Sequence, residues 1–130
     1  MSIRIVRLGS PRTSHEGLRI GTVRRPPRGV PKQEFAKRDY YDAWFPLLAP
    51  SLETMKAAHA ARTDAQWNAF KRRYRREMAA PDAAHAIALL AALSRHTDLS
   101  VGCYCEDEAH CHRSILRELL HEAGASIAND

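Results

Sequence analysis

The sequence predicts a small α/β domain, in which helices cover a mostly parallel or mixed sheet. Apolar and polar residues alternate over 3–8 and 18–23, as is typical of strands. Apolar residues then recur at helical spacing through the middle of the chain, and a further strand and helix follow from residue 99. A chain of 130 residues has the length of one domain, so we expect a single domain over residues 1–130.

The second candidate strand leads into a proline-rich basic segment, residues 24–32. Its three prolines fix φ and exclude a regular helix, and it carries four basic residues, among them Arg25 and Arg28. We therefore expect a rigid basic loop. The aromatic segment 39–45 that follows fits either a short third strand or a helical turn.

Three helices are expected in the middle of the chain. Ser51 is suited to cap the first, which ends near Arg62. Thr63 and Gln66 have the spacing of a capping box at the start of the second. Pro81 suits the first turn of the third.

The stretch from residue 99 to residue 120 contains all three cysteines. Residues 99–103 alternate as in a short strand, and helical spacing begins at Ser114. The chain after Gly124 is expected to fray. Titratable and metal-ligating residues fill the turn between strand and helix, namely Glu106, Asp107, Glu108, His110, Cys111, His112 and Arg113.

Strand direction decides whether the basic loop meets this turn. If the last strand is parallel to the second, right-handed crossovers place segments 24–32 and 106–113 at the same carboxyl edge of the sheet. Open α/β sheets bind ligands at this edge. We therefore expect the functional site there.

The net charge of +5 is unevenly distributed along the chain. Residues 1–40 carry 10 Lys and Arg against 3 Asp and Glu, whereas residues 81–130 carry 3 against 8. One interpretation is that the two segments neutralise each other across the fold. The other is an anion-attracting surface that favours phosphate-bearing small molecules.

Cysteine usage and hydropathy indicate a cytoplasmic protein. Three cysteines cannot all pair in disulfides. No charged-then-apolar signal segment opens the chain, and no apolar run approaches the roughly 20 residues that span a bilayer. We expect no membrane partner.

The start of the last helix is a candidate anion site. Free backbone N–H groups there favour a phosphate or a carboxylate, with Arg113 and Ser114 as further donors. Arg25 and Arg28 would reach the same anion from the basic loop. Alternatively, Arg113 pairs with the acids at 106–108 as an ion pair that closes the turn.

The cysteines are candidate nucleophiles. Cys111 lies in the first helical turn, where the helix dipole and the neighbouring His112 should lower its thiol pKa. Cys105 at the strand end is the rival, and Cys103 reads as a packed strand residue. Seven residues, three of them acidic, separate Cys105 from Arg113, which argues against phosphatase chemistry.

Metal binding is a further alternative, because thiolate and imidazole ligands suit zinc or iron. The C-x-C spacing on an extended strand is not that of a zinc knuckle, and no second cysteine pair exists. We therefore predict neither a metal site nor a cofactor.

A nucleic-acid-binding module is the alternative function. Five of the six residues in 71–76 are basic, and helical spacing directs Arg72 and Arg76 to solvent. Together with loop 24–32, they would bind phosphates in a salt-dependent way. A solvated helix face explains the same pattern.

Four motifs resemble the domain-of-unknown-function 488 (DUF488) family of small bacterial and archaeal proteins, from about residue 3 to about residue 122. The most specific is Cys105-x5-Cys111-His-Arg113. The others are Arg24-Arg-Pro-Pro-Arg-Gly-Val, Trp44-x3-Leu48-Ala-Pro-Ser51 and Trp67-x2-Phe70-x3-Tyr74-x2-Glu77.

The resemblance implies a compact three-layer α/β fold, but no reaction. It implies motif positions at Arg25, Arg28, Gly29, Cys105, Cys111, His112 and Arg113. From the residues themselves we expect an anion-binding pocket in which Cys111, Cys105 and His112 are the catalytic candidates. A thiol-dependent enzyme is one use of such a pocket. Whether the protein is an enzyme, and its oligomeric state, are not predicted.

Overall fold

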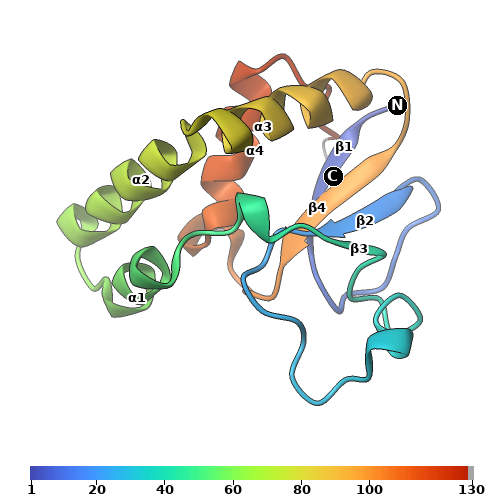
Figure 1. Ribbon diagram of the computed structural model, residues 1–130, viewed down its shortest axis with the longest axis horizontal. Helices are drawn as coiled ribbons and strands as arrows, with labels where there is room; N and C mark the ends of the chain where they lie inside the picture. Colours follow the sequence, from blue (N-terminus) through green and yellow to red (C-terminus); the bar gives the residue numbers. More distant parts are fainter. Residues whose placement is uncertain (129–130) are drawn as a thin grey trace.

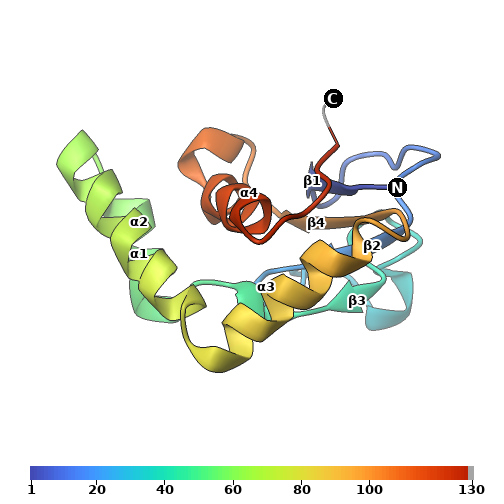
Figure 2. The same cartoon turned by 90° about the horizontal axis from the view of Figure 1, so that it is seen from above.

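The computed structural model describes residues 1–128 and has a four-stranded parallel sheet in the order β1-β4-β2-β3. Figures 1 and 2 show the α-helices beside this sheet. The predicted α/β class is therefore confirmed. The elements are β1 (Ile3–Arg7), β2 (Leu18–Gly21), β3 (Ala43–Trp44), α1 (Leu52–Ala60), α2 (Asp64–Met78), α3 (Pro81–Leu93), β4 (Leu99–Cys103) and α4 (His112–Glu122).

The helices of the middle segment begin where their capping residues predict. The Ser51 side chain accepts a hydrogen bond from the backbone N–H of Thr54 at the start of α1. Thr63 and Gln66 form a complete capping box on α2. Pro81 is in the first turn of α3, where its missing N–H costs no hydrogen bond.

One expectation is resolved by the structure and two are corrected. The aromatic segment contains a two-residue strand, β3, followed by a 3-10 helix at Pro46–Leu48. Helix α4 begins at His112, two residues before Ser114, because Cys111 is extended and serves as the N-cap. The expected fraying after Gly124 is wrong for residues 125–128, since the Ile3 N–H donates to the Ser126 carbonyl. Residues 129–130 lie outside the described part.

One face of the sheet packs against the helices. In Figure 1 the α-helices lie above and to the left of the strands. Ile5, Ile20 and Val101 point from three strands into a buried cluster with Phe70 of α2 and Leu116 of α4. Strand alternation places every second residue on this face, so the helices cover a continuous apolar surface.

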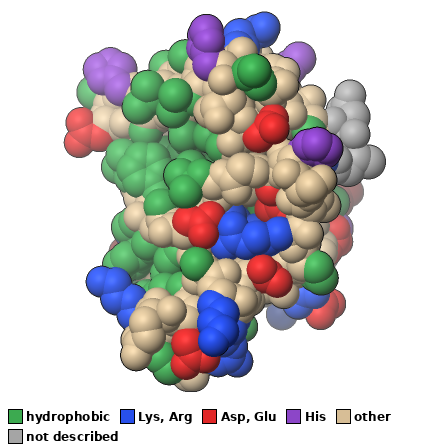
Figure 3. All heavy atoms as spheres, turned by 90° about the vertical axis from the view of Figure 1, so that its right-hand side faces the viewer, with side chains coloured by type: hydrophobic (Ala, Val, Ile, Leu, Met, Phe, Trp, Pro, Cys, Tyr) green, Lys and Arg blue, Asp and Glu red, His purple; other side chains and the backbone are tan. Residues whose placement is uncertain are grey.

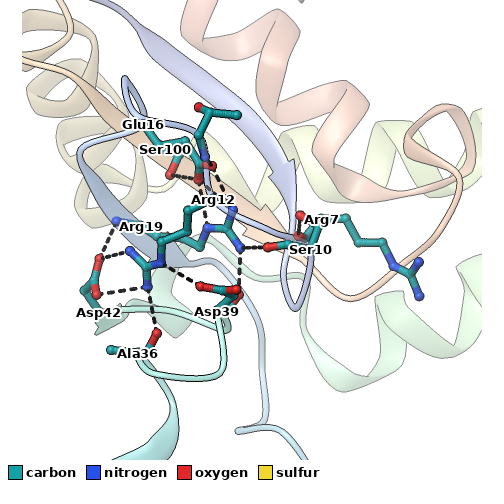
Figure 4. A network of polar contacts seen from close by, with 10 residues as sticks. Arg7, Ser10, Arg12, Glu16, Arg19, Ala36, Asp39, Asp42 and Ser100 are labelled. Carbon is teal, nitrogen blue, oxygen red and sulfur yellow. Dashed lines mark hydrogen bonds and ion pairs between the residues drawn. The ribbon is translucent and has the colours of Figure 1, made fainter.

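The opposite face is covered by loop segments, which form the third layer. Arg19 of β2 is fully buried there and forms an ion pair with Glu16, with Nη2 and Oε1 2.7 Å apart. Its Nη1 also donates to the backbone carbonyls of Ser10 and Asp39 (Figure 4). Ser100 of β4 donates to Glu16. One guanidinium therefore holds both loops against the sheet.

Part of the charge asymmetry is neutralised across the fold. Arg7 of β1 lies 3.6 Å from Glu106, and Arg75 of α2 contacts both Glu118 and Glu122 of α4. Figure 3 shows basic and acidic side chains next to each other on one face of the molecule. Within residues 1–128, no helix is long and apolar enough to cross a bilayer.

The N-terminus of α1 is held by a carboxylate from α2. Glu77 accepts hydrogen bonds from the Ser51 backbone N–H at 2.9 Å, the Ser51 hydroxyl at 2.6 Å and the Thr54 hydroxyl at 2.7 Å. Burial alone would raise the Glu77 pKa, but these donors outweigh it and lower the pKa below its ordinary value.

Replacing Glu77 with Gln should lower the free energy of unfolding at pH 7 by about 1–2 kcal/mol, since an amide cannot accept all three bonds. A carboxyl with a lowered folded-state pKa stabilises the protein above its unfolded pKa, and this stability disappears as the pH falls through the folded value. The wild type should therefore lose its advantage over Glu77→Gln below about pH 4.5. Urea unfolding across this range measures both effects. Equal stabilities at pH 7 would contradict the first, and a difference that stays constant as the pH falls would contradict the second.

Candidate functional site

A cavity of about 450 Å³ lies at the carboxyl edge of the sheet. Strands β2 and β4 are adjacent and parallel, so the segments that follow them leave the sheet side by side. Residues 23–28 and residues 103–105 both line the cavity, and α1 and α2 complete it. The expected meeting of the basic loop with the cysteine turn is therefore confirmed.

The acids of the turn are paired outside the cavity. Glu106 lies near Arg7, and Asp107 accepts from His110 Nδ1 at 2.8 Å. Glu108 forms a bidentate pair with Arg117 of α4 at 2.7 and 3.0 Å. None of the three acids lines the cavity. The three carboxylates are therefore paired and are not part of the cavity wall.

His112 has a defined tautomer. Its Nε2 lies 2.8 Å from the Thr22 carbonyl oxygen, which can only accept, so Nε2 carries the proton. Nδ1 therefore has a free lone pair, and the Cys111 Sγ lies 3.7 Å from it. Burial lowers the pKa of His112 to about 4, so the ring is neutral at pH 7. His112 Nδ1 can therefore accept a hydrogen bond from the Cys111 thiol, as an alternative to the bond from this thiol to Cys105.

The three thiols interact with one another. Hydrogen bonds from Cys103 and Cys111 hold the pKa of Cys105 well below its ordinary value, and the nearby Arg113 acts in the same direction. The pKa of Cys103 is raised by its bonds to Cys105 and Cys111 and by burial. Among the three interacting thiols, Cys105 is therefore the one whose thiolate form is favoured.

The expected lowering of the Cys111 pKa is wrong. Contact with Cys103 lowers this pKa, but the bond to Cys105 and burial outweigh it, and the net pKa is raised. Cys111 is buried and the histidine beside it is neutral, so the dipole at the N-terminus of α4 does not lower the net pKa of this thiol. Cys105, the rival candidate, has the lowered pKa and an exposed position.

Arg113 and Ser114 do not line the cavity. Arg113 is buried beneath the turn, where its Nη2 donates to the Cys105 carbonyl at 2.5 Å. Among the described residues, the acids at 106–108 form ion pairs with other partners, not with Arg113. The Ser114 hydroxyl donates to the Cys111 carbonyl. Both residues shape the turn.

The basic loop contributes two free guanidinium groups to the cavity. Arg24 is anchored, because it donates to the carbonyls of Ala49 and Pro50. Arg25 and Arg28 line the cavity and are exposed. Their side chains make no hydrogen bond or ion pair within residues 1–128.

Several wall residues were not anticipated from the sequence. Cys103 was expected only to pack, yet it lines the cavity together with Cys105. A C-x-C spacing at a strand end places both thiols on one side, so this spacing could have indicated that the two share a site. Tyr104 donates its hydroxyl to the Arg25 carbonyl at 2.8 Å. Met55 and His59 come from α1, which no local pattern connects with the cysteine turn.

Comparison with known proteins supports the motif-based expectation. The family model described as "Active DUF488-N3 subclade" matches residues 3–124. No curated protein and no solved structure matches the chain significantly. Since the family match covers nearly the whole chain, including both halves of the cavity, this protein belongs to the DUF488 family.

Proposed function

We propose that the cavity is a thiol-dependent active site for a small organic anion, with Cys105 as the attacking thiol. One observation carries the proposal, namely that an exposed thiol lines the cavity together with two buried thiols, and hydrogen bonding to these thiols holds its pKa well below the ordinary value. Such bonds stabilise the thiolate, which is the nucleophilic form of cysteine.

Cys105 is better placed to attack than Cys111. Cys111 is only 3% exposed, and its thiol proton faces His112 or Cys105. Cys105 is exposed and is not part of any helix or strand. The buried charge of Arg113 lies behind it and favours its thiolate. We therefore assign attack to Cys105 and a positioning role to the Cys111–His112 pair.

The basic loop supports an anionic group on the ligand. Arg25 and Arg28 stand on the cavity wall without partners among the described residues. Pro26 and Pro27 between them restrict the backbone, which fixes the positions from which the two arginine side chains extend. Guanidinium groups bind phosphate and carboxylate in a bidentate way, so either anion fits.

The rest of the wall favours an apolar ligand body. Val23, Met55 and Phe70 line the cavity together with three prolines of the neighbouring segments. A volume of about 450 Å³ lies in the range of small-molecule sites, which is roughly 300–1,000 Å³. The ligand class is therefore an apolar or aromatic body with one anionic group.

Alkylation by iodoacetamide, followed site by site by mass spectrometry, tests the thiol. Cys105 should react faster than Cys103 and Cys111, with a pH midpoint well below the value of about 8.5 for an ordinary thiol. Inorganic phosphate should slow the reaction of Cys105, because it occupies the cavity near Arg28. Arg28→Ala should remove this protection, whereas Arg72→Ala on the exposed face of α2 should retain it.

Two results would overturn the proposal. An ordinary pH midpoint at Cys105 removes the activated thiol. Equal phosphate protection in wild type and Arg28→Ala removes the anion site. Circular dichroism of each variant shows that the fold is retained, and Cys105→Ser is the blank for alkylation.

A further inference from the structure

We infer that this cavity reduces organic hydroperoxides, with Cys105 as the attacking thiol and Cys111 as the thiol that closes a disulfide with it. The inference rests on the proposed function, because it uses the same Cys105, and it adds the reaction and the substrate class. Its basis is the grouping of three free thiols around one cavity.

The three thiols lie around one cavity. All three are free and line its wall. The ligand atoms of Cys103, Cys111 and His112 lie within 4.8 Å of one another. Cys105 and Cys111 both lie in the segment between β4 and α4, outside the sheet, and a disulfide between them brings their sulfurs to about 2.05 Å.

Cys111 is the better partner for Cys105. Cys103 is the last residue of β4, which pairs with β1 on one side and β2 on the other. Cys111 instead lies at the junction of a 3-10 turn and α4, outside the sheet. Its thiol also faces the free lone pair of His112 Nδ1 at 3.7 Å, which can take up the thiol proton when the sulfur attacks.

The first step oxidises Cys105. Its thiolate attacks the terminal oxygen of the hydroperoxide ROOH, an S–O bond forms and the O–O bond breaks. The alkoxide RO⁻ takes a proton from solvent and leaves as ROH, while Cys105 becomes the sulfenic acid. Two electrons pass from sulfur to the peroxide.

The second step forms the disulfide. The Cys111 sulfur attacks the Cys105 sulfenic sulfur, the S–O bond breaks, and the hydroxyl leaves as water with the Cys111 proton. An external dithiol then reduces the Cys105–Cys111 disulfide and is itself oxidised. One turnover thus consumes one hydroperoxide and one dithiol, and releases one alcohol and one water.

The cavity wall favours an organic hydroperoxide over hydrogen peroxide. Val23, Met55 and Phe70 provide apolar surface for the organic group, and hydrogen peroxide has none to bury. The rim arginines, Arg25 and Arg28, suit a substrate that also carries a carboxylate or phosphate. We expect cumene hydroperoxide to oxidise the protein at least about tenfold faster than hydrogen peroxide does.

The test treats the reduced, chelator-washed full chain with one equivalent of cumene hydroperoxide. Free thiols should fall by two per chain, and peptide mapping should find the Cys105–Cys111 disulfide. Cys111→Ser should stop at a Cys105 sulfenic acid that dimedone traps, and Cys105→Ser should consume no peroxide. Cys103→Ser should still form the disulfide if it folds, and the wild-type peptide map decides the partner if it does not.

The contrary outcomes are separable from failure of the proposed function. If Cys105 alkylates rapidly and phosphate protects it, yet peroxide gives no intramolecular disulfide, the inference fails and the proposed function stands. A Cys103–Cys105 disulfide also overturns it. So does a stoichiometric metal ion that survives the chelator and protects Cys103 and Cys111 from oxidation.

Discussion

Replacing Arg19 with Met should lower the free energy of unfolding by about 3–5 kcal/mol. Arg19 is fully buried, and its removal leaves the Glu16 carboxylate in the interior without its ion-pair partner. The carbonyls of Ser10 and Asp39 lose a donor at the same time. Both loops of the third layer should loosen, which urea unfolding and amide hydrogen exchange over 9–16 and 36–42 measure.

Arg38→Met is the matched control for this prediction. Arg38 pairs with Glu34 at 4.0 Å on the surface, and both side chains are more than two-fifths exposed. An exposed pair of this kind contributes less than about 1 kcal/mol. If Arg19→Met and Arg38→Met have similar effects, the buried network does not hold the loops.

Replacing Cys111 with Ala should raise the pH midpoint of Cys105 alkylation by about 1–2 pH units. The pKa of Cys105 is lowered by hydrogen bonds from Cys103 and then from Cys111, so the alanine variant removes one of two thiol donors. A hydrogen bond to a charged group contributes about 1.5–3 kcal/mol, which corresponds to this change in midpoint. At pH 7 the variant should therefore react more slowly.

Cys111→Ser separates this effect from simple loss of packing. A serine hydroxyl still donates and also suits the N-cap of α4, so the midpoint should return most of the way to the wild-type value. The same low midpoint in all three proteins would show that the Cys111 proton does not act on Cys105. The midpoints of the two variants are informative even where their stabilities differ.

Much of the fold was predictable because the signals are local. The capping box at Thr63, the cap at Ser51 and the proline at Pro81 each fix a helix start through contacts within four residues. The position of the site followed from topology, since parallel strands bring the segments after β2 and β4 to one edge.

The chemistry of the turn was less predictable, because it depends on contacts between distant segments. The neutral state of His112 depends on burial, and its tautomer depends on the Thr22 carbonyl, ninety residues earlier. The sequence alone does not reveal this environment, so it favoured Cys111 as the thiol with the lowered pKa. The buried Arg19 was also inconspicuous, because alternation alone does not show that loops cover the second face of the sheet.

The segment at Val23–Arg25 is fixed from three directions before any ligand arrives. The Trp44 indole donates to the Val23 carbonyl, Arg24 reaches the carbonyls of Ala49 and Pro50, and Tyr104 donates to the Arg25 carbonyl. The conformational entropy of this wall is therefore lost during folding and not during binding. The cavity is preorganised, and a ligand needs to order only the two free guanidinium groups, so even a small molecule can retain most of its contact energy as affinity.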